Sequence, residues 1–167
     1  IIFDKTGTIT EGKPKVTDFI NVSPLSNGIL LTHIASAENN SEHFLAQAIV
    51  NYAQDEHDFS FKTVKDFNIT AGRGLQAKVG HYQVLIGNQA WLQEKNIDIT
   101  ELLPHAHQLG LKGKTPVFTA FNGNASAIFG IADQPRESAK QAIAALNQLN
   151  IETLMVTGDT SETAHHI

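Results

Sequence analysis

The 167-residue sequence has no cysteine, and it has only one tryptophan and one methionine. The absence of cysteine excludes disulfides and thiolate metal sites in this segment. No apolar run approaches the roughly 18 residues that a membrane-spanning helix needs. No cluster of five lysines or arginines occurs and the net charge is -5, so neither nucleic acid nor an anionic membrane surface is indicated as a partner. At this length the chain can form one domain or two small ones.

The chain opens on an apolar run, Ile1–Phe3, which ends in Asp4. Such a run predicts a parallel strand that is buried on both faces. Ligands of open α/β sheets bind at the carboxyl ends of their strands, so Asp4 is a candidate nucleophile. The hydroxyl and backbone N–H groups of the next residues are donors for a bound oxyanion: Thr6, Gly7 and Thr8. Alternatively, Asp4 only caps the following turn.

The remaining chain alternates between two kinds of pattern. Helical spacing of apolar residues predicts helices at 24–38, 41–52, 88–95, 101–111 and 135–149. Strand patterns occur at 15–22, 61–69, 75–79, 83–86, 116–121, 125–132 and 152–156. Ser41 is the expected cap of the second helix, and Trp91 is expected in the core. Asn122-Gly123-Asn124 predicts a tight hairpin.

The two ends of the chain have a parallel α/β pattern, whereas the middle predicts an antiparallel sheet with helices. We therefore expect the strand at 152–156 to pair with the opening strand. The middle is then an insertion, joined by linkers near 12–16 and 133–136. Because the first residue is not Met and a helical pattern begins at Ser161, we expect the sequence to be a piece of a longer polypeptide.

Thr157-Gly158-Asp159 follows the last predicted strand and precedes a helix. A hydroxyl and backbone amides in that position can hold a phosphoryl group. The simpler interpretation is that Asp159 or Ser161 caps the helix.

Taken together, Asp4-Lys5-Thr6-Gly7-Thr8 resembles the phosphorylation motif of the P-type ATPases, a branch of the haloacid dehalogenase superfamily. The aspartate of that motif takes the γ-phosphoryl group of ATP as an acyl phosphate. The segment 157–159 resembles the family's second phosphate-holding motif, although Thr160 stands where that motif usually continues with Asn. The resemblance implies these catalytic residues: Asp4, Lys5, Thr6, Thr157, Gly158 and Asp159.

Thr6 separates two branches of the superfamily. Soluble phosphatases of this superfamily usually carry a second aspartate at that position, where it protonates the leaving group and then activates water. A threonine hydroxyl does not shuttle protons near pH 7, which removes general acid–base help worth roughly 10²–10⁴-fold. A long-lived phosphoenzyme suits an ion pump and handicaps a phosphatase.

Further motifs resemble the heavy-metal-transporting subgroup. Ser41-Glu42-His43-Phe44-Leu45 resembles its Ser-Glu-His-Pro-Leu motif, whose His and Glu contact the adenine of ATP, with Phe44 in place of proline. Imidazole can stack on or hydrogen-bond a purine, and a carboxylate accepts from the adenine amino group. In isolation the segment would be only an exposed first turn of a helix.

Three more short patterns follow in the subgroup's order. Gly72-Arg73-Gly74 resembles its Gly-x-Gly, which lets backbone approach the nucleotide, and is otherwise a hairpin turn or bulge. Gly87-Asn88 matches another nucleotide-side motif, and Asn88 alone would be a helix cap. Asp133-Gln134-Pro135-Arg136 resembles the Asp-x-x-Arg hinge, or else caps a helix with proline in its first turn.

The resemblance implies an α/β fold: an incomplete Rossmann-like phosphorylation domain of haloacid dehalogenase type with an inserted α+β nucleotide-binding domain. The expected boundaries are 1–12 and 133–167 for the first and 13–132 for the second. ATP or ADP would bind through Glu42, His43, Gly72, Gly74, Gly87 and Asn88. Mg²⁺ would lie at Asp4 and the backbone carbonyl of Thr6.

The resemblance also implies a longer pump, whose transported metal ion binds elsewhere. Copper is favoured over zinc, cadmium and cobalt. Its partners would be the pump's own actuator and transmembrane domains, with this segment on the cytoplasmic face and no nucleic acid bound. Since the family's downstream lysine and second magnesium-binding aspartate do not occur in this segment, we expect nucleotide binding without turnover. The alternatives are a soluble phosphatase of the same superfamily and a non-catalytic nucleotide-binding module.

Overall fold

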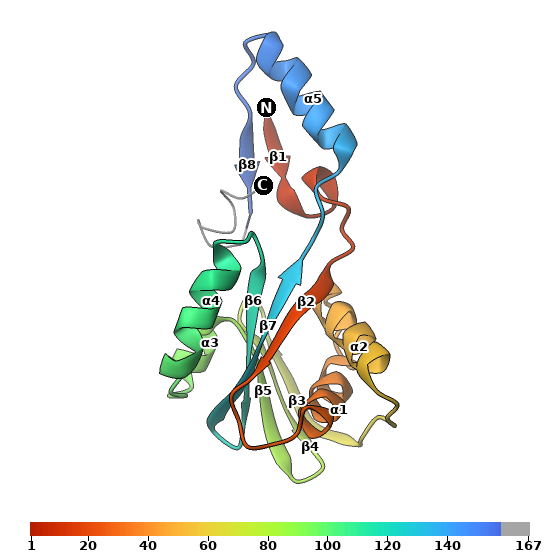
Figure 1. The fold of residues 1–167 in the computed structure, drawn as a ribbon, viewed down its shortest axis with the longest axis vertical. Coiled ribbons are helices and arrows are strands. Elements are labelled where there is room, and N and C mark those ends of the chain that lie inside the picture. The colour runs from red at the N-terminus through yellow and green to blue at the C-terminus, as the bar shows by residue number, and fades with distance from the viewer. Residues whose placement is uncertain (158–167) are drawn as a thin grey trace.

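The computed structural model describes residues 1–157 and has two parts. Figure 1 shows a larger part built on an antiparallel sheet and a smaller part that carries the N-terminus. We call residues 15–132 the antiparallel lobe. The parallel unit consists of residues 2–9 and 137–156. Within residues 1–157, no helix is both long and apolar enough to cross a membrane.

The parallel unit contains two short strands, β1 (Ile2–Asp4) and β8 (Leu154–Val156), which pair in parallel with Asp4 opposite Val156. One turn of π-helix, η1 (Lys5–Ile9), follows β1, and α5 (Glu137–Gln148) precedes β8. The predicted pairing of the first and last strands is confirmed.

The predicted burial of the opening strand is wrong in this structure. Ile2 is 68% exposed and Val156 is 57% exposed, and no residue of α5 is buried. Parallel strands are buried where helices cover both faces of the sheet. In the described part of this unit, α5 is the one α-helix that accompanies two three-residue strands, and this is too little apolar surface to enclose them.

The antiparallel lobe has a six-stranded sheet in the order β2-β7-β6-β5-β4-β3. Its strands are β2 (Lys15–Asn21), β3 (Val64–Thr70), β4 (Gly74–Val79), β5 (Tyr82–Gly87), β6 (Thr115–Phe121) and β7 (Asn124–Ala132). The predicted meander and hairpin are confirmed. Asn122 and Gly123 both have positive φ, 48° and 83°, as a two-residue hairpin turn requires.

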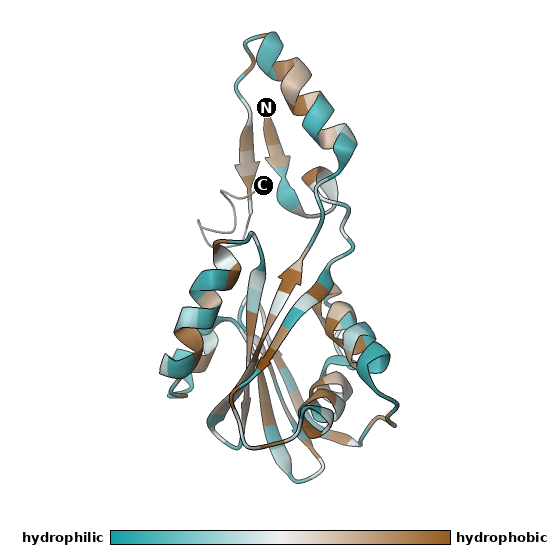
Figure 2. Cartoon of the chain, in the orientation of Figure 1, coloured by the Kyte–Doolittle hydropathy of each residue, from teal (hydrophilic) through white to brown (hydrophobic). Residues whose placement is uncertain are grey.

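Helices cover both faces of this sheet (Figure 1). The pair α1 (Asn27–Glu38) and α2 (Phe44–Glu56) packs on one face. On the other face lie α3 (Gln89–Glu94), the 3₁₀ turn η2 (Thr100–Leu102) and α4 (Leu103–Gly110). In Figure 2 the hydrophobic colour concentrates on the strands between these helices.

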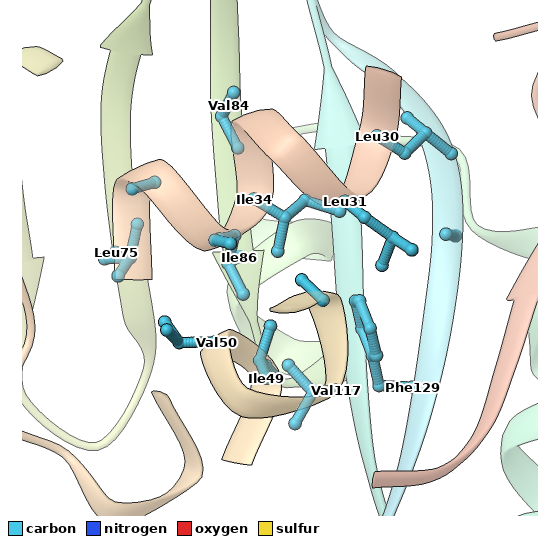
Figure 3. Packing of buried hydrophobic residues seen from close by; sticks show 14 of the residues in the cluster. Leu30, Leu31, Ile34, Ile49, Val50, Leu75, Val84, Ile86, Val117 and Phe129 are labelled. Atoms are coloured by element: carbon cyan, nitrogen blue, oxygen red, sulfur yellow. The ribbon is translucent and has the colours of Figure 1, made fainter. Parts of the chain in front are cut away.

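Two apolar clusters therefore form, one on each face of the sheet. In the larger one, Ile34 of α1 and Ile49 of α2 meet Phe129 of β7, and all three are fully buried (Figure 3). The smaller one includes Trp91, which is 3% exposed, so the predicted place of Trp91 in the core is confirmed. The lobe thus has an interior of its own that holds its surface loops in place.

Candidate functional site

Asp4 lies at the carboxyl edge of the parallel pair. Because it pairs with Val156, the residue that follows β8, Thr157, emerges beside it at the same edge. Asp4 is exposed, and its side chain makes no capping hydrogen bond to η1, so the alternative of a simple cap is not realised. The predicted partners Gly158 and Asp159 lie outside the described residues, as do Thr160 and Ser161.

The turn after Asp4 faces the antiparallel lobe. Lys5 is buried, with 6% of its surface exposed, and its carbonyl accepts hydrogen bonds from the N–H (3.0 Å) and the hydroxyl (3.1 Å) of Thr10. Its side chain lines a small cavity together with Phe44 and Leu45 of the lobe and Asp133 of the second linker. Thr6 belongs to the same turn. The loop next to the candidate nucleophile thus lines the same cavity as the segment that follows Glu42 and His43.

Asp133 and Arg136 tie the two linkers together. The Asp133 carboxylate accepts from the Thr10 hydroxyl at 2.5 Å and from the backbone N–H groups of Gly12 and Lys13, both at 3.2 Å. Arg136 donates to the carbonyls of Gly7, Thr10 and Glu11 at 2.9–3.3 Å. Asp133 therefore does not cap α5, as the simpler interpretation held. It anchors the incoming linker instead.

The second helix begins later than its sequence pattern predicted. Its cap is His43 and not Ser41, because the Nδ1 atom of His43 accepts from the N–H of Leu45 at 3.2 Å. Ser41 instead accepts, through its hydroxyl, from the N–H of His43 at 3.3 Å. Glu42 and His43 are both exposed and precede the helix.

This cap also defines the protonation of His43. An Nδ1 atom that accepts a hydrogen bond carries no proton, so the neutral ring keeps its proton on Nε2 as a donor. Partial desolvation lowers the pKa of His43, which favours the neutral ring at physiological pH. The Phe44 ring stacks on His43 with centroids 4.4 Å apart and an angle of 25° between the rings.

The glycine motifs form a second cluster at one end of β4 and β5. Gly74 pairs with Gly87 across these strands. Asn88 joins the cluster through two hydrogen bonds, from its N–H to the carbonyl of Arg73 and from its side-chain amide to the carbonyl of Gly72, both 2.9 Å. The side-chain oxygen of Asn88 also accepts from the N–H of Trp91 at 2.9 Å, so its predicted capping of α3 is confirmed.

Two of these glycines are required by close approach of the backbone. A Cβ atom on Gly74 would lie 2.1 Å from the carbonyl oxygen of Ile86, and one on Gly87 would lie 2.4 Å from that of Arg73. By contrast, a Cβ on Gly72 would meet nothing within 4 Å, although its φ of +69° favours glycine. Gly72 is thus the glycine whose open surface is available to a ligand.

The sequence patterns did not single out Glu38, a buried carboxyl group at the end of α1. It is 6% exposed, and desolvation raises its pKa from 4.5 to about 7. Charged side chains are almost never buried without a purpose or a partner. The sequence signal that could have identified Glu38 is that it is the one acidic residue in the apolar stretch of α1, five residues before His43.

Comparison with known proteins extends over the whole chain. Residues 1–167 match the family model described as haloacid dehalogenase-like hydrolase. The chain belongs to the haloacid dehalogenase-like hydrolases. Within that family it is 40% identical over 167 residues to a copper-exporting P-type ATPase of Staphylococcus haemolyticus. That alignment covers all of this chain and 20% of the relative, so the chain spans about a fifth of the length of the curated relatives it matches.

Solved structures show the same similarity. A zinc-transporting PIB-type ATPase in an E2.Pi state has a TM-score of 0.71 and 32% identity, covering 99% of this chain and 26% of that chain. The catalytic CPx-ATPase domain CopB-B has a TM-score of 0.69 and 28% identity, covering 98% of this chain and 53% of that chain. The predicted fold class, a haloacid dehalogenase-type part with an inserted antiparallel α+β part, is confirmed.

The structure thus brings the candidate residues together in three groups. Asp4, Lys5 and Thr157 share one edge of the parallel unit. Glu42 and His43 precede α2, and the four residues Gly72, Gly74, Gly87 and Asn88 meet at the end of β4 and β5. Lys5 of the first group and Phe44, the residue after His43, line the same cavity.

Proposed function

We propose that this chain is the ATP-binding and phosphorylation part of a heavy-metal cation-transporting P-type ATPase, and that Asp4 receives the γ-phosphoryl group. The observation that carries the proposal is the edge shared by Asp4 and Thr157, in a chain similar over its full length to a copper-exporting P-type ATPase. A carboxylate at the carboxyl end of a parallel strand is positioned for attack on a bound phosphate ester.

Residues 13–132 would form the nucleotide-binding domain, and 1–12 with 133–167 would form part of the phosphorylation domain. Support comes from the linkers, which Asp133 and Arg136 hold together where the chain passes between the two parts. In the nucleotide-binding domain, the Nε2–H of His43 would donate to a ring nitrogen of adenine. Glu42 would accept from its amino group, and the backbone at Gly72, Gly74, Gly87 and Asn88 would lie along the ribose and phosphates.

Transfer would proceed by attack of a carboxylate oxygen of Asp4 on the γ-phosphorus. As that P–O bond forms, the bond from the γ-phosphorus to the β–γ bridging oxygen breaks, and ADP leaves with the electron pair. The phosphoryl group would be positioned by Lys5, Thr6, Thr157, Gly158 and Asp159, since catalysis of this transfer is mainly positioning and electrostatics.

The donors around Asp4 fit Mg²⁺ only in combination with phosphate oxygens. Among residues 1–157 no group of three His, Cys, Asp or Glu side chains could hold a metal ion by itself. Mg²⁺ is commonly held by one or two carboxylates together with substrate phosphates, which matches a single exposed Asp4 with the carbonyl of Thr6. When bound, the ion would neutralise charge on the phosphoryl oxygens.

The transported ion would be copper, bound by membrane segments of the longer protein, and the partners of this chain would be the actuator and transmembrane domains of that protein. The copper-exporting relative at 40% identity supports copper over the other metals. The phosphatase alternative is disfavoured by Thr6, which cannot replace the proton shuttle that hydrolysis of an acyl phosphate needs.

Calorimetry and phosphate release on the 167-residue chain test the proposal. We expect ATP and ADP to bind, Asp4→Asn to bind ATP as tightly, and His43→Ala to lose most of the affinity. No steady release of phosphate is expected from ATP. Steady hydrolysis that Asp4→Asn abolishes would contradict the expected lack of turnover, and hydrolysis of small phosphoesters would support a phosphatase instead.

A further inference from the structure

The segment that resembles the adenine motif differs from it at Phe44, because the motif has proline at this position. Proline offers no aromatic ring, whereas the Phe44 ring stacks on His43 at 4.4 Å and 25°. Phe44 is the first residue of α2 and is 44% exposed, whereas the other apolar residues of that helix are buried or half-buried. Phe44 belongs to neither apolar cluster of the lobe, so its ring is available for contact with a ligand.

We propose that Phe44 is a base-stacking residue of the nucleotide site: adenine lies on the Phe44 ring, beside His43 and within reach of its Nε2–H. This inference rests on the proposed function and assigns it a further contact. Adenine has a flat π-surface that stacks favourably on an aromatic side chain. Phe44 thus supplies the surface on which the base stacks, and His43 supplies a hydrogen-bond donor at the edge of the base.

The neighbouring cavity places the base on the exposed side of this pair. The cavity between Phe44 and Lys5 has a volume of about 40 Å³, which admits a water molecule and not a purine. The base must therefore lie outside the cavity, on the solvent-exposed side of Phe44 and His43. Because Phe44 and Lys5 line the same cavity, and Lys5 directly follows Asp4, a base stacked on Phe44 would lie on the side of the lobe that faces the candidate nucleophile.

His43 is held in a compatible state. Its Nδ1 atom is occupied by the N–H of Leu45, so the neutral ring cannot turn over to exchange its two nitrogens without losing that bond. The stacked Phe44 also fixes the plane of the imidazole. The two rings are therefore arranged before a ligand arrives, which reduces the entropy lost on binding.

The test compares Phe44→Leu, which removes the ring and keeps apolar bulk, with Phe44→Tyr, which keeps the ring. The matched control is Phe61→Leu, because Phe61 is 43% exposed and packs on Phe59 in a loop with no proposed role. Binding of ATP to the 167-residue chain is measured by calorimetry, and the H2 and H8 protons of bound ATP are followed by NMR.

We expect Phe44→Leu to weaken ATP binding roughly tenfold. We also expect an upfield ring-current shift of the adenine protons in wild type and Phe44→Tyr that disappears in Phe44→Leu. Phe61→Leu should change neither readout. Circular dichroism shows whether each variant is folded. If Phe44→Leu is not folded, the shifts of the adenine protons in wild type and Phe44→Tyr still test the inference.

Equal or tighter ATP binding by Phe44→Leu would overturn the inference, because the ring would then cover His43 rather than bind the base. Adenine protons without an upfield shift in wild type would overturn it as well, since Phe44 would then act only through His43. If wild type binds ATP and His43→Ala abolishes binding while Phe44→Leu does not weaken it, the proposed function stands and this inference alone fails. A wild-type chain that does not bind ATP contradicts both.

Discussion

The antiparallel lobe and the parallel unit are stabilised in different ways. In the lobe, helices cover both faces of the sheet and side chains such as Phe129 are completely buried. In the parallel unit, Ile2 and Leu149 are 68% and 69% exposed, and the unit is connected to the lobe by the polar contacts of Asp133 and Arg136. The comparison shows that packing stabilises the part with the proposed nucleotide residues, whereas backbone pairing and linker hydrogen bonds position Asp4.

The largest difference should appear when an apolar side chain is truncated in each part. We expect Phe129→Ala to lower the free energy of unfolding by about 3–5 kcal/mol, because it leaves a cavity in the core. Leu149→Ala should change it by less than about 0.5 kcal/mol, since that side chain is largely in solvent. Urea unfolding followed by fluorescence of the single tryptophan, Trp91, measures both. Equal losses would disprove the contrast.

A second contrast lies within the glycine cluster of the lobe. Gly74→Ala should cost roughly 2–4 kcal/mol, because its Cβ would collide with the Ile86 carbonyl 2.1 Å away. Gly72→Ala, with open space and only an unfavourable φ, should cost about 1 kcal/mol. Thermal unfolding of the two variants measures both losses of stability. A smaller loss of stability for Gly74→Ala than for Gly72→Ala would mean that β4 and β5 separate easily.

The buried carboxyl of Glu38 should make the lobe less stable as pH rises. Below about pH 4.5 it is protonated in both states, between 4.5 and about 7 the folded state retains a proton that the unfolded state has lost, and above about 7 both are ionised. The free energy of unfolding therefore falls across this window, by about 3 kcal/mol at most. Glu38→Gln should remove this fall.

The matched control is Glu42→Gln, which changes an exposed carboxylate four residues away and should keep the pH dependence of the wild type. Urea titrations at pH 4.5, 6 and 7.5 compare the three proteins. If the free energy of unfolding of Glu38→Gln depends on pH as in the wild type, a group other than Glu38 causes the dependence.

The smallest effect is expected at the linkers. Arg136→Met removes the hydrogen bonds to the carbonyls of Thr10 and Glu11, and should cost about 1 kcal/mol locally because the guanidinium is exposed. Amide exchange at Gly12 and Lys13 should then accelerate roughly fivefold, without a change in the urea midpoint of Trp91 fluorescence. Lys140→Met, an exposed cation on α5, is the control that should alter neither.

Much of the fold could be predicted from local patterns. Apolar spacing placed all five α-helices of the described chain, although it combined η2 with α4, and Asn122-Gly123 predicted its hairpin. Local patterns also anticipated that the strand ending in Asp4 would pair with the one ending in Val156, because parallel α/β units have few arrangements. Neighbours along the chain determine the helices and the hairpin, whereas the pairing of β1 with β8 joins the two ends of the described chain and was limited by topology.

The errors have non-local causes. The burial of Ile1–Phe3 was overestimated because an apolar run does not report how much structure covers it. Ser41 and His43 both have acceptor atoms, and only the path of the chain decides which one caps α2. Glu38 was missed for the same reason, since burial depends on the packing of α1 against the rest of the lobe. Gly74 and Gly87 lie opposite each other because of the register between β4 and β5, and neither sequence motif determines that register.

The antiparallel lobe begins and ends on adjacent strands, because Lys15 of β2 pairs with Ala132 of β7. A segment whose two ends emerge side by side can be cut out and rejoined to another host without stretching either chain. Residues 15–132, grafted into a surface loop of an unrelated protein, should therefore keep their own interior, and the graft would contain Glu42, His43 and the glycine cluster without Asp4.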